Sequence, residues 1–428
     1  MLPILKNVNF LSFFASRTLA NFADSIYFIA LLWTVQTTFH SPAFTGFTFT
    51  ALSAAAMFSF AFGPLIDRFS AAALSGIALL VQGVILLVIP SLAGPNPLSF
   101  SIVLILVLIA ALFSALFYPA NMSLIPQILE DKDKLVQGNS LVSTSDQLIN
   151  LIGFLIGGTL VAWIGSNPSF YAASAALFFG SLLFFVLMRR LKAVKPNSGN
   201  VTNSGNDTAE RPAAGFRAYA AEIKEGLQFL WRNTFLRVLM LLNVIANFSV
   251  SLLVIVLPSL GESYGSAFHY SAIYVAFFFG MIVGALLTNA IKKSGLNISL
   301  FWIGSGLALL LFYVLPFGIG WKAGSIALFG LCSGVVNVLQ MSFLQLLTEE
   351  RMMGRVMSTV TTISNIAIPL GSVIGSSLAL QLRIETMFLL AGLMIICCGI
   401  VMLAIRSVRS YTAEASAPAP SQPTEAAL

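Results

Sequence analysis

The chain has 428 residues, of which 58% are hydrophobic and 9% charged, whereas a water-soluble protein has about 25% charged residues. This composition excludes an ordinary soluble enzyme or binding domain and makes lipid the main solvent of the chain. The formal net charge of +6 could suggest nucleic-acid binding, but the positions of the basic residues favour a different explanation.

The first apolar stretch, residues 9–36, is long enough to cross a bilayer yet contains Arg17, Asn21 and Asp24. At helical spacing these three residues share one face, and Asp24 falls near the middle of the span. A charged group at that depth costs roughly 2.5–3.5 kcal/mol on insertion scales. Such a group is retained when it is paired, faces water or has a function. We therefore interpret this stretch as the candidate proton-coupling and substrate site of a transporter.

Apolar runs of about 20 residues or more predict twelve transmembrane helices. They lie at roughly 9–36, 43–66, 72–90, 98–122, 140–164, 169–188, 235–259, 268–291, 297–316, 323–347, 355–381 and 385–405. Nineteen of the 22 Lys and Arg fall at one end of these spans, against Lys322 and Arg383 at the other and Arg17 within a span. This bias predicts that both termini are cytoplasmic, and it accounts for the positive charge without any nucleic-acid partner.

The loops divide the predicted spans into two groups of six. We expect an N-terminal six-helix bundle over residues 1–190 and a C-terminal bundle over 234–410. Residues 191–233 between them are rich in Asn, Ser and Gly and then form an amphipathic pattern, which predicts a cytoplasmic linker with a surface helix at 221–232. The Ala/Pro/Ser-rich tail, 411–428, is expected to be disordered.

The two groups of spans show signs of duplication. Residues 7–25 align with residues 233–251 at an offset of 226, so that Asn21 matches Asn247 and Arg17 matches Asn243. Gly153 and Gly157 recur at an offset of 218. These matches predict an all-α integral membrane protein with twelve transmembrane helices in two six-helix bundles related by a parallel pseudo-two-fold repeat. Only the first copy keeps the charges.

Other polar residues in the spans are candidates for the same site. Asp146 and Asn150 lie in the fifth span, and the sequence leaves open whether Arg17 pairs with Asp24 or with Asp146. The second half offers uncharged side chains that either contact a substrate or join helices by hydrogen bonds. These are Asn243, Asn247, Asn337, Gln340 and Asn365.

The loop after the second span has a glycine, Gly63, followed four residues on by Asp67 and Arg68. This motif resembles the cytoplasmic signature of the major facilitator superfamily, although Ser70-Ala71-Ala72 replaces the usual basic continuation. The resemblance implies that Gly63 allows close helix packing. It also implies that Asp67 and Arg68 belong to a conformational latch at the cytoplasmic end.

The first span narrows the resemblance, because Arg17 to Asp24 is similar to the opening of the branch that holds macrolide efflux proteins and the enterobactin exporter. The Leu124-Ile-Pro126-Gln loop, Asn139 and the Glu225-Gly226-Leu227 run also resemble that branch. The resemblance implies proton antiport and export of an amphipathic drug, siderophore or secondary metabolite across a bacterial inner membrane. We expect a monomer.

Two other classes of function stay open. One is a non-transporting membrane sensor or scaffold, and the other is an uptake, metal or lipid transporter of the same fold. An enzyme is disfavoured, because the chain has two His residues and no clustered catalytic set. The cysteines Cys332, Cys397 and Cys398 lie in apolar runs without metal-ligand spacing, so we expect no metal and no cofactor.

Overall fold

The structure is a computed structural model that describes residues 2–129, 131–194, 216–314 and 318–411. The first half contributes α2 (Val8–Phe39), α3 (Pro42–Ala54), the 3-10 helix η1 (Ala55–Phe62), α4 (Gly63–Arg68), α5 (Ala71–Leu92), α6 (Pro97–Met122), α8 (Lys132–Ile164) and α9 (Ser166–Val194). The second half contributes α11 (Thr234–Ser263), α12 (Ala267–Leu287), α13 (Gly295–Val314), α14 (Ile319–Leu347), α15 (Met353–Ala379) and α16 (Ile384–Ala404). Shorter elements are α1 (Leu2–Leu5), α7 (Ile125–Ile128), α17 (Arg406–Arg409), η2 (Thr288–Ala290) and η3 (Glu350–Met352).

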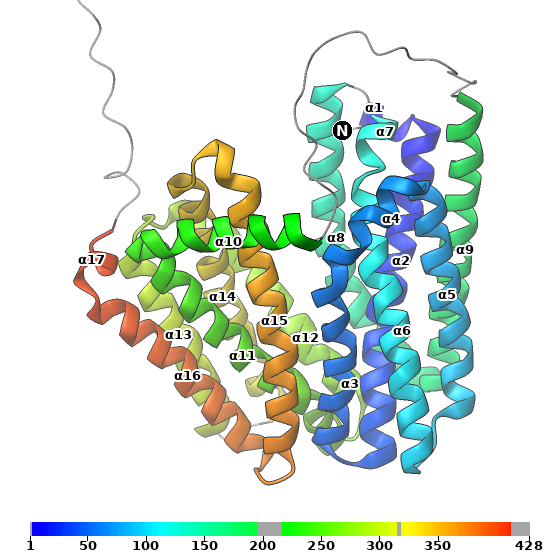
Figure 1. Cartoon of the computed structure of the whole chain (residues 1–428). Helices are drawn as coiled ribbons and strands as arrows, with labels where there is room; N and C mark the ends of the chain where they lie inside the picture. The colour runs from blue at the N-terminus through cyan, green and yellow to red at the C-terminus, as the bar shows by residue number, and fades with distance from the viewer. Residues whose placement is uncertain (1, 130, 195–215, 315–317, 412–428) are drawn as a thin grey trace, which may run out of the picture.

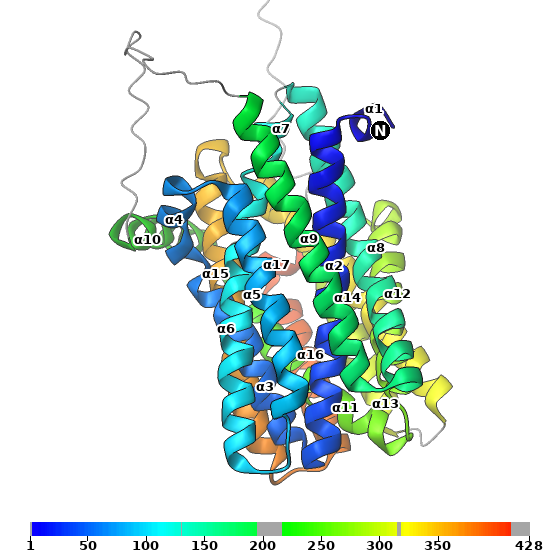
Figure 2. The ribbon, with the colours of Figure 1, turned by 90° about the vertical axis from the view of Figure 1, so that its right-hand side faces the viewer.

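These helices form two bundles that stand side by side (Figure 1). The amphipathic helix α10 (Phe216–Arg232) lies across one end of the second bundle, packs on α15 and reaches η1 of the first bundle. Figure 2 shows α10 next to α4 from a second direction. We call the end that carries α1, α7 and α10 the linker end. The other end, with the short loops at 40–41, 93–96, 264–266 and 380–383, is the short-loop end.

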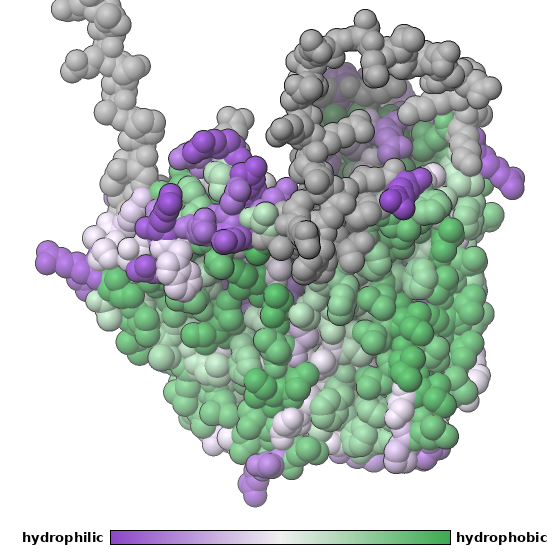
Figure 3. Space-filling model, viewed as in Figure 1, coloured by the Kyte–Doolittle hydropathy of each residue, from purple (hydrophilic) through white to green (hydrophobic). Residues whose placement is uncertain are grey.

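The surface matches the predicted membrane location. Figure 3 shows a wide hydrophobic flank over both bundles and hydrophilic residues gathered over the linker end. In the described part of the chain, eleven helices are long and apolar enough to cross a membrane. The predicted residues 195–215 of the linker and 412–428 of the tail lie outside the described residues.

The second predicted span differs from the others, because it is not one continuous α-helix. α3 has 13 residues and passes into the 3-10 helix η1 before α4. Thr48, Thr50 and Ser53 donate their hydroxyl protons to backbone carbonyls four residues earlier, a contact that often bends helices. Pro64 lies in the first turn of α4, a position where its missing N–H is tolerated, so a new α-helix begins here.

The predicted repeat is confirmed at the start of each bundle. The Asn7 side chain accepts hydrogen bonds from the N–H groups of Asn9 and Phe10, at 3.0 and 3.3 Å, and so caps α2. The Asn233 side chain caps α11 in the same way, at 2.9 and 3.2 Å from the second and third residues after it. The sequence match at an offset of 226 therefore reflects the same local structure.

The same glycines join equivalent helices in the two halves. A Cβ at Gly153 of α8 would collide with Ser25 of α2, and a Cβ at Gly371 of α15 would meet Ser251 of α11. The lack of a side chain lets each pair of helices approach closely. This packing sets the position of α8 against α2 and therefore of the polar residues that the two helices carry.

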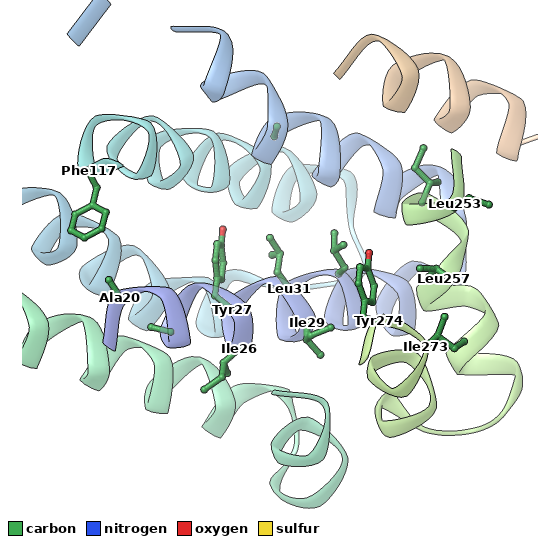
Figure 4. Close-up of a cluster of buried hydrophobic side chains, with 14 of the residues drawn as sticks. Ala20, Ile26, Tyr27, Ile29, Leu31, Phe117, Leu253, Leu257, Ile273 and Tyr274 are labelled. Carbon is green, nitrogen blue, oxygen red and sulfur yellow. The ribbon is translucent and has the colours of Figure 1, made fainter. Parts of the chain in front are cut away.

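The two bundles contact each other from the middle of the membrane region to the short-loop end. Phe154 of α8 stacks on Tyr274 of α12, with ring centroids 5.2 Å apart, and Phe28 of α2 meets the same ring edge-on at 5.7 Å. Thr50 and Ser372 are hydrogen-bonded at 2.7 Å between α3 and α15. Figure 4 shows the buried side chains of α2, α11 and α12 around Tyr274.

Candidate functional site

Arg17 is the centre of a buried polar cluster inside the first bundle. Its Nε and Nη2 atoms donate to the two carboxylate oxygens of Asp146, at 3.1 and 2.7 Å, in a bidentate pair. Its Nη1 atom donates to Oδ1 of Asn121 at 2.6 Å. The Arg17 side chain is 3% exposed and that of Asp146 is 23% exposed. The sequence left both Asp24 and Asp146 as possible partners of Arg17, and in the structure Arg17 pairs with Asp146.

Two further side chains complete this cluster. Asn21 donates to Asp146 at 2.5 Å, and the Tyr118 hydroxyl donates to Oδ1 of Asn21 at 3.2 Å. The Arg17 guanidinium lies 5.5 Å from the centre of the Tyr118 ring. Tyr118 and Asn121 were not among the predicted site residues. The sequence did contain a signal for them, because they are two polar residues, three positions apart and close to Pro119, within an otherwise apolar span. The predicted Asn150 is half-buried and makes no hydrogen bond within the described residues.

Asp24 lies apart from this cluster and lines a cavity of about 330 Å³ within the first bundle. Its carboxylate has no hydrogen bond and no ion pair among the residues that the structure describes. The cavity walls are mainly apolar and include Phe28 and Phe49, and Gln82 and Tyr118 are among their polar members. Tyr118 thus connects the Arg17 cluster to the cavity. The result is an unpaired acid beside aromatic rings in a space large enough for part of an organic molecule.

Aromatic rings close this region toward the short-loop end. Phe28, which lines the cavity, packs edge-on against Phe49, Phe154 and Tyr274, at 5.7–6.2 Å between centroids. Phe154 also stacks on Phe278 at 5.3 Å. Because α2, α3 and α8 belong to one bundle and α12 to the other, these rings form a layer across the boundary between them.

A second polar link between the bundles lies at the short-loop end. Glu262 of α11 accepts a hydrogen bond from Nε2 of Gln36 at 2.6 Å and pairs with His40. Gln36 in turn accepts from the Thr45 hydroxyl at 3.0 Å. None of these residues was predicted as a site residue. No local sequence signal marks them, because Glu262 is 222 positions from His40 and 226 positions from Gln36 along the chain.

A second cavity, of about 260 Å³, lies in the other bundle near the linker end. It is lined by four of the predicted polar residues, Asn243, Asn247, Asn337 and Gln340, together with Ser364. Asn243 donates to the Ser364 hydroxyl at 3.3 Å, and Asn247 donates to the backbone carbonyl of Asn243 at 3.1 Å. The fifth predicted residue, Asn365, does not line this cavity.

The cavity and the charged cluster occupy equivalent places in the two halves. Asn243 and Asn247 correspond to Arg17 and Asn21 at the offset of 226. Ser364 lies 218 positions after Asp146, which is the offset that relates the paired glycines. The Asn243–Ser364 hydrogen bond is therefore the neutral counterpart of the Arg17–Asp146 ion pair.

The match extends to the fourth helix of each half. Asn337 and Gln340 of α14 lie 219 positions after Tyr118 and Asn121 of α6, with the same spacing of three. Like those two residues, they lie beside the residues of the first and fifth helices of their bundle.

The predicted latch falls mostly outside what the structure describes. The backbone of Gly63, Asp67 and Arg68 lies in α4, and the Arg68 side chain is exposed. The surroundings of Gly63 and the side chain of Asp67 lie outside what the structure describes. Their role in a latch stays a prediction.

Comparison with known proteins places the chain among transporters. Residues 13–372, and in an overlapping match residues 239–428, fit the family described as Major Facilitator Superfamily. The chain is 28% identical over 272 residues to "Enterobactin exporter EntS" of Salmonella choleraesuis (strain SC-B67), an alignment that covers 62% of this chain and 59% of that protein. It is 27% identical over 197 residues to "Macrolide efflux protein A" of Streptococcus pyogenes, covering 45% of this chain and 49% of that protein. The matched regions thus span less than two thirds of either relative.

Two solved structures share the fold. A nucleoside transporter, NupG, covers 92% of this chain with a TM-score of 0.66 at 15% identity, and 99% of its own chain is matched. An auto-inhibited peptide transporter of the POT family covers 94% with a TM-score of 0.67 at 14% identity, with 98% of its own chain matched. At this identity the likeness concerns the fold alone.

Proposed function

The chain belongs to the Major Facilitator Superfamily, and on that premise we propose that it is a secondary active exporter that exchanges protons for an amphipathic organic compound. The observation that carries the proposal is Asp24, an unpaired carboxyl group in the middle of a membrane-spanning helix and beside an aromatic-walled cavity. Acidic residues within transmembrane segments are costly and mark proton or substrate pathways. The neighbouring Arg17 does not neutralise Asp24, because Asp146 and Asn121 already engage it.

The direction of transport and the orientation in the membrane are part of the proposal. Export is supported by the names of two similar proteins, an enterobactin exporter and a macrolide efflux protein. We assign the linker end, which carries most of the basic residues, to the cytoplasm of a bacterium and so place both termini there. In this orientation the short-loop end faces outward. The inter-bundle contacts of that end then describe a state that is closed to the outside.

The mechanism follows from what each residue contacts. Asp24 binds a proton or the cationic group of the substrate, one at a time, while Phe28 and Phe49 contact apolar parts of the substrate. The Arg17–Asp146 pair joins α2 to α8, so that α2 moves with its bundle when the bundles rock. Opening to the outside requires separation of the aromatic layer and of the link between Gln36 and Glu262. We expect the protein to do this as a monomer.

Proton flux in liposomes tests the proposal. Purified protein is reconstituted with a pH-sensitive dye inside, a proton gradient is imposed, and lipophilic cations, macrolides, siderophores and peptide antibiotics are added in turn. We expect at least one compound to dissipate the gradient with the unmodified protein. Asp24→Asn should reduce this flux to the level of empty liposomes, because an amide cannot carry the proton.

The matched control removes a different acid. Glu349→Gln alters a surface carboxylate that pairs with Arg351, and it should leave the flux unchanged. Normal flux in Asp24→Asn would exclude the coupling role of Asp24. A lack of compound-dependent flux with the unmodified protein, across the whole panel, would favour a sensor or scaffold instead.

A further inference from the structure

One titratable pair crosses the boundary between the bundles. His40 ends α2 of the first bundle, and its Nδ1 atom pairs with Oε1 of Glu262 in α11 of the second. The other carboxylate oxygen of Glu262 accepts a hydrogen bond from Gln36 at 2.6 Å, so the same end of α2 engages both oxygens. Among the ion pairs between described residues, this is the one that joins the two bundles.

The backbone holds His40 in position for this contact. His40 is the C-cap of α2 and has a φ of 51°, in the left-handed region, where histidine is several-fold enriched. Its N–H donates to the carbonyl of Gln36 at 2.7 Å, so His40 moves with α2. A positive charge at the carboxyl end of a helix is favourable, because the last carbonyl groups carry partial negative charge. Protonated His40 therefore interacts favourably with Glu262 and with the end of its own helix.

The other charged or titratable groups at the short-loop end all belong to the second bundle. They are Tyr264 and His269, Lys322 of α14, and Arg383 and Glu385 beside the start of α16. Arg383 and Glu385 are exposed and line the same open pocket of about 560 Å³ as His40 and Glu262. Lys322 and His269 lie against the Tyr264 ring, at 5.4 and 5.9 Å from its centre. The facing ends of α3 and α15 have no titratable residue.

We propose that His40 and Glu262 form a pH-sensitive outer gate, in which protonation of His40 holds the short-loop end closed. The inference rests on the proposed function, because that function assigns this end to the outside. Histidine changes its charge between pH 5 and 8, so acid surroundings add a positive charge opposite Glu262 and disfavour separation of α2 from α11. At alkaline pH the neutral imidazole keeps one N–H but loses the ionic attraction. The Thr50–Ser372 hydrogen bond and the aromatic layer carry no charge and do not change over this range.

The direction of this effect opposes the driving force. An exporter that exchanges protons has its largest driving force when the outside is acid, which is the condition in which this gate is hardest to open. The pair thus limits outward opening, and proton entry with it, in acid surroundings. Because the His40 side chain is 71% exposed and that of Glu262 is 27% exposed, we expect a modest effect of about twofold to fivefold.

Labelling of a cysteine behind the gate measures outward opening directly. Ser53→Cys places a thiol in the Asp24 cavity, which the aromatic layer separates from the short-loop end. Spheroplasts that express the full chain are treated with an impermeant maleimide at an external pH of about 5 and of about 8. Every variant also carries Asp24→Asn, so that protonation of Asp24 does not contribute to the response. The chain without Ser53→Cys gives the background from the three native cysteines.

Two substitutions at His40 separate its charge from its shape. His40→Gln does not titrate, and His40→Lys is charged at both pH values. Comparing variants at the same pH cancels the pH dependence of thiol reactivity. Relative to His40→Gln, the protein with His40 should be labelled equally fast at about pH 8 and about twofold to fivefold more slowly at about pH 5. His40→Lys should be labelled slowly at both. The matched control, His269→Gln, alters the other histidine and should behave like the protein that keeps both.

The outcomes separate this gate from the proposed function, because neither substrate nor proton flux enters the measurement. If the rate with His40 and the rate with His40→Gln keep the same ratio at both pH values, the gate is wrong and the proposed function stands. Fast labelling of His40→Lys would also overturn the gate, since a fixed positive charge would then not hold the end closed. If no variant is labelled from outside, the assignment of the short-loop end to the outside fails, and the gate fails with it.

Discussion

The ion pair between Arg17 and Asp146 permits a quantitative prediction, because the second bundle contains its neutral counterpart. Asp146→Ser would leave the Arg17 guanidinium, 3% exposed, with Asn121 as its remaining acceptor. Removing one partner of a buried ion pair costs about 3–5 kcal/mol, since the other charge stays buried and uncompensated. Asp146 is 23% exposed, so water reaches part of the site, and we expect a loss of about 3 kcal/mol.

A second substitution should recover much of this loss. The double variant Arg17→Asn with Asp146→Ser installs the same residue types as Asn243 and Ser364, which are hydrogen-bonded at 3.3 Å. It removes the isolated charge and leaves a smaller deficit from lost packing. We expect the double variant to be more stable than Asp146→Ser alone, with a coupling free energy of about 2 kcal/mol.

The measurement is the apparent melting temperature of each purified variant in detergent, followed by intrinsic fluorescence. A loss of about 3 kcal/mol in a bundle of this size corresponds to a decrease of roughly 10 °C for Asp146→Ser. Ser364→Ala is the matched control in the other bundle and should cost about 1 kcal/mol, because it removes one neutral hydrogen bond. If the losses of Asp146→Ser and of Arg17→Asn, each measured alone, simply add in the double variant, the pair does not stabilise the bundle and the reasoning is refuted.

Two other predictions concern the boundary between the bundles. Glu262→Gln should weaken the link to Gln36 at the short-loop end. An impermeant maleimide should then label a cysteine introduced nearby up to about fivefold faster. An unchanged labelling rate would exclude a gating role for Glu262. Gly158→Leu should block transport without lowering the melting temperature, because its side chain would collide with Ser271 of the opposite bundle, and normal transport would contradict this. Gly157→Leu should instead lower the melting temperature, since Gly157 packs on α2 within its own bundle.

Several features could be predicted from the sequence because they depend on local properties. Length and hydropathy located the membrane spans, and the match of Asn7 with Asn233 marked the start of each half, where the structure shows both residues as helix caps. Regular spacing placed Arg17, Asn21 and Asp24 on one face, and two of these three residues are indeed in one hydrogen-bonded cluster with Asp146. Four of the five uncharged candidates in the second half line one cavity.

The remaining features depend on how distant helices pack. Arg17 and Asp24 are two helical turns apart, about 10 Å along the axis, so an interhelical partner was equally possible from the sequence. The glycines of α8 decide between these options, because they allow it to approach α2 closely enough for Asp146 to reach Arg17. The broken second span and the role of Glu262 likewise depend on contacts that no local pattern encodes.

The sequence by itself thus determined that this is a duplicated twelve-helix membrane protein in which Arg17 and Asp24 of the first span have uncharged counterparts in the second half, since hydropathy, spacing and repetition are properties of the chain alone. Only the tertiary structure decided which acid is paired. Asp146 is held by Arg17, and Asp24 is left unpaired in its cavity, because side chains from α2, α6 and α8 meet only after the helices have packed.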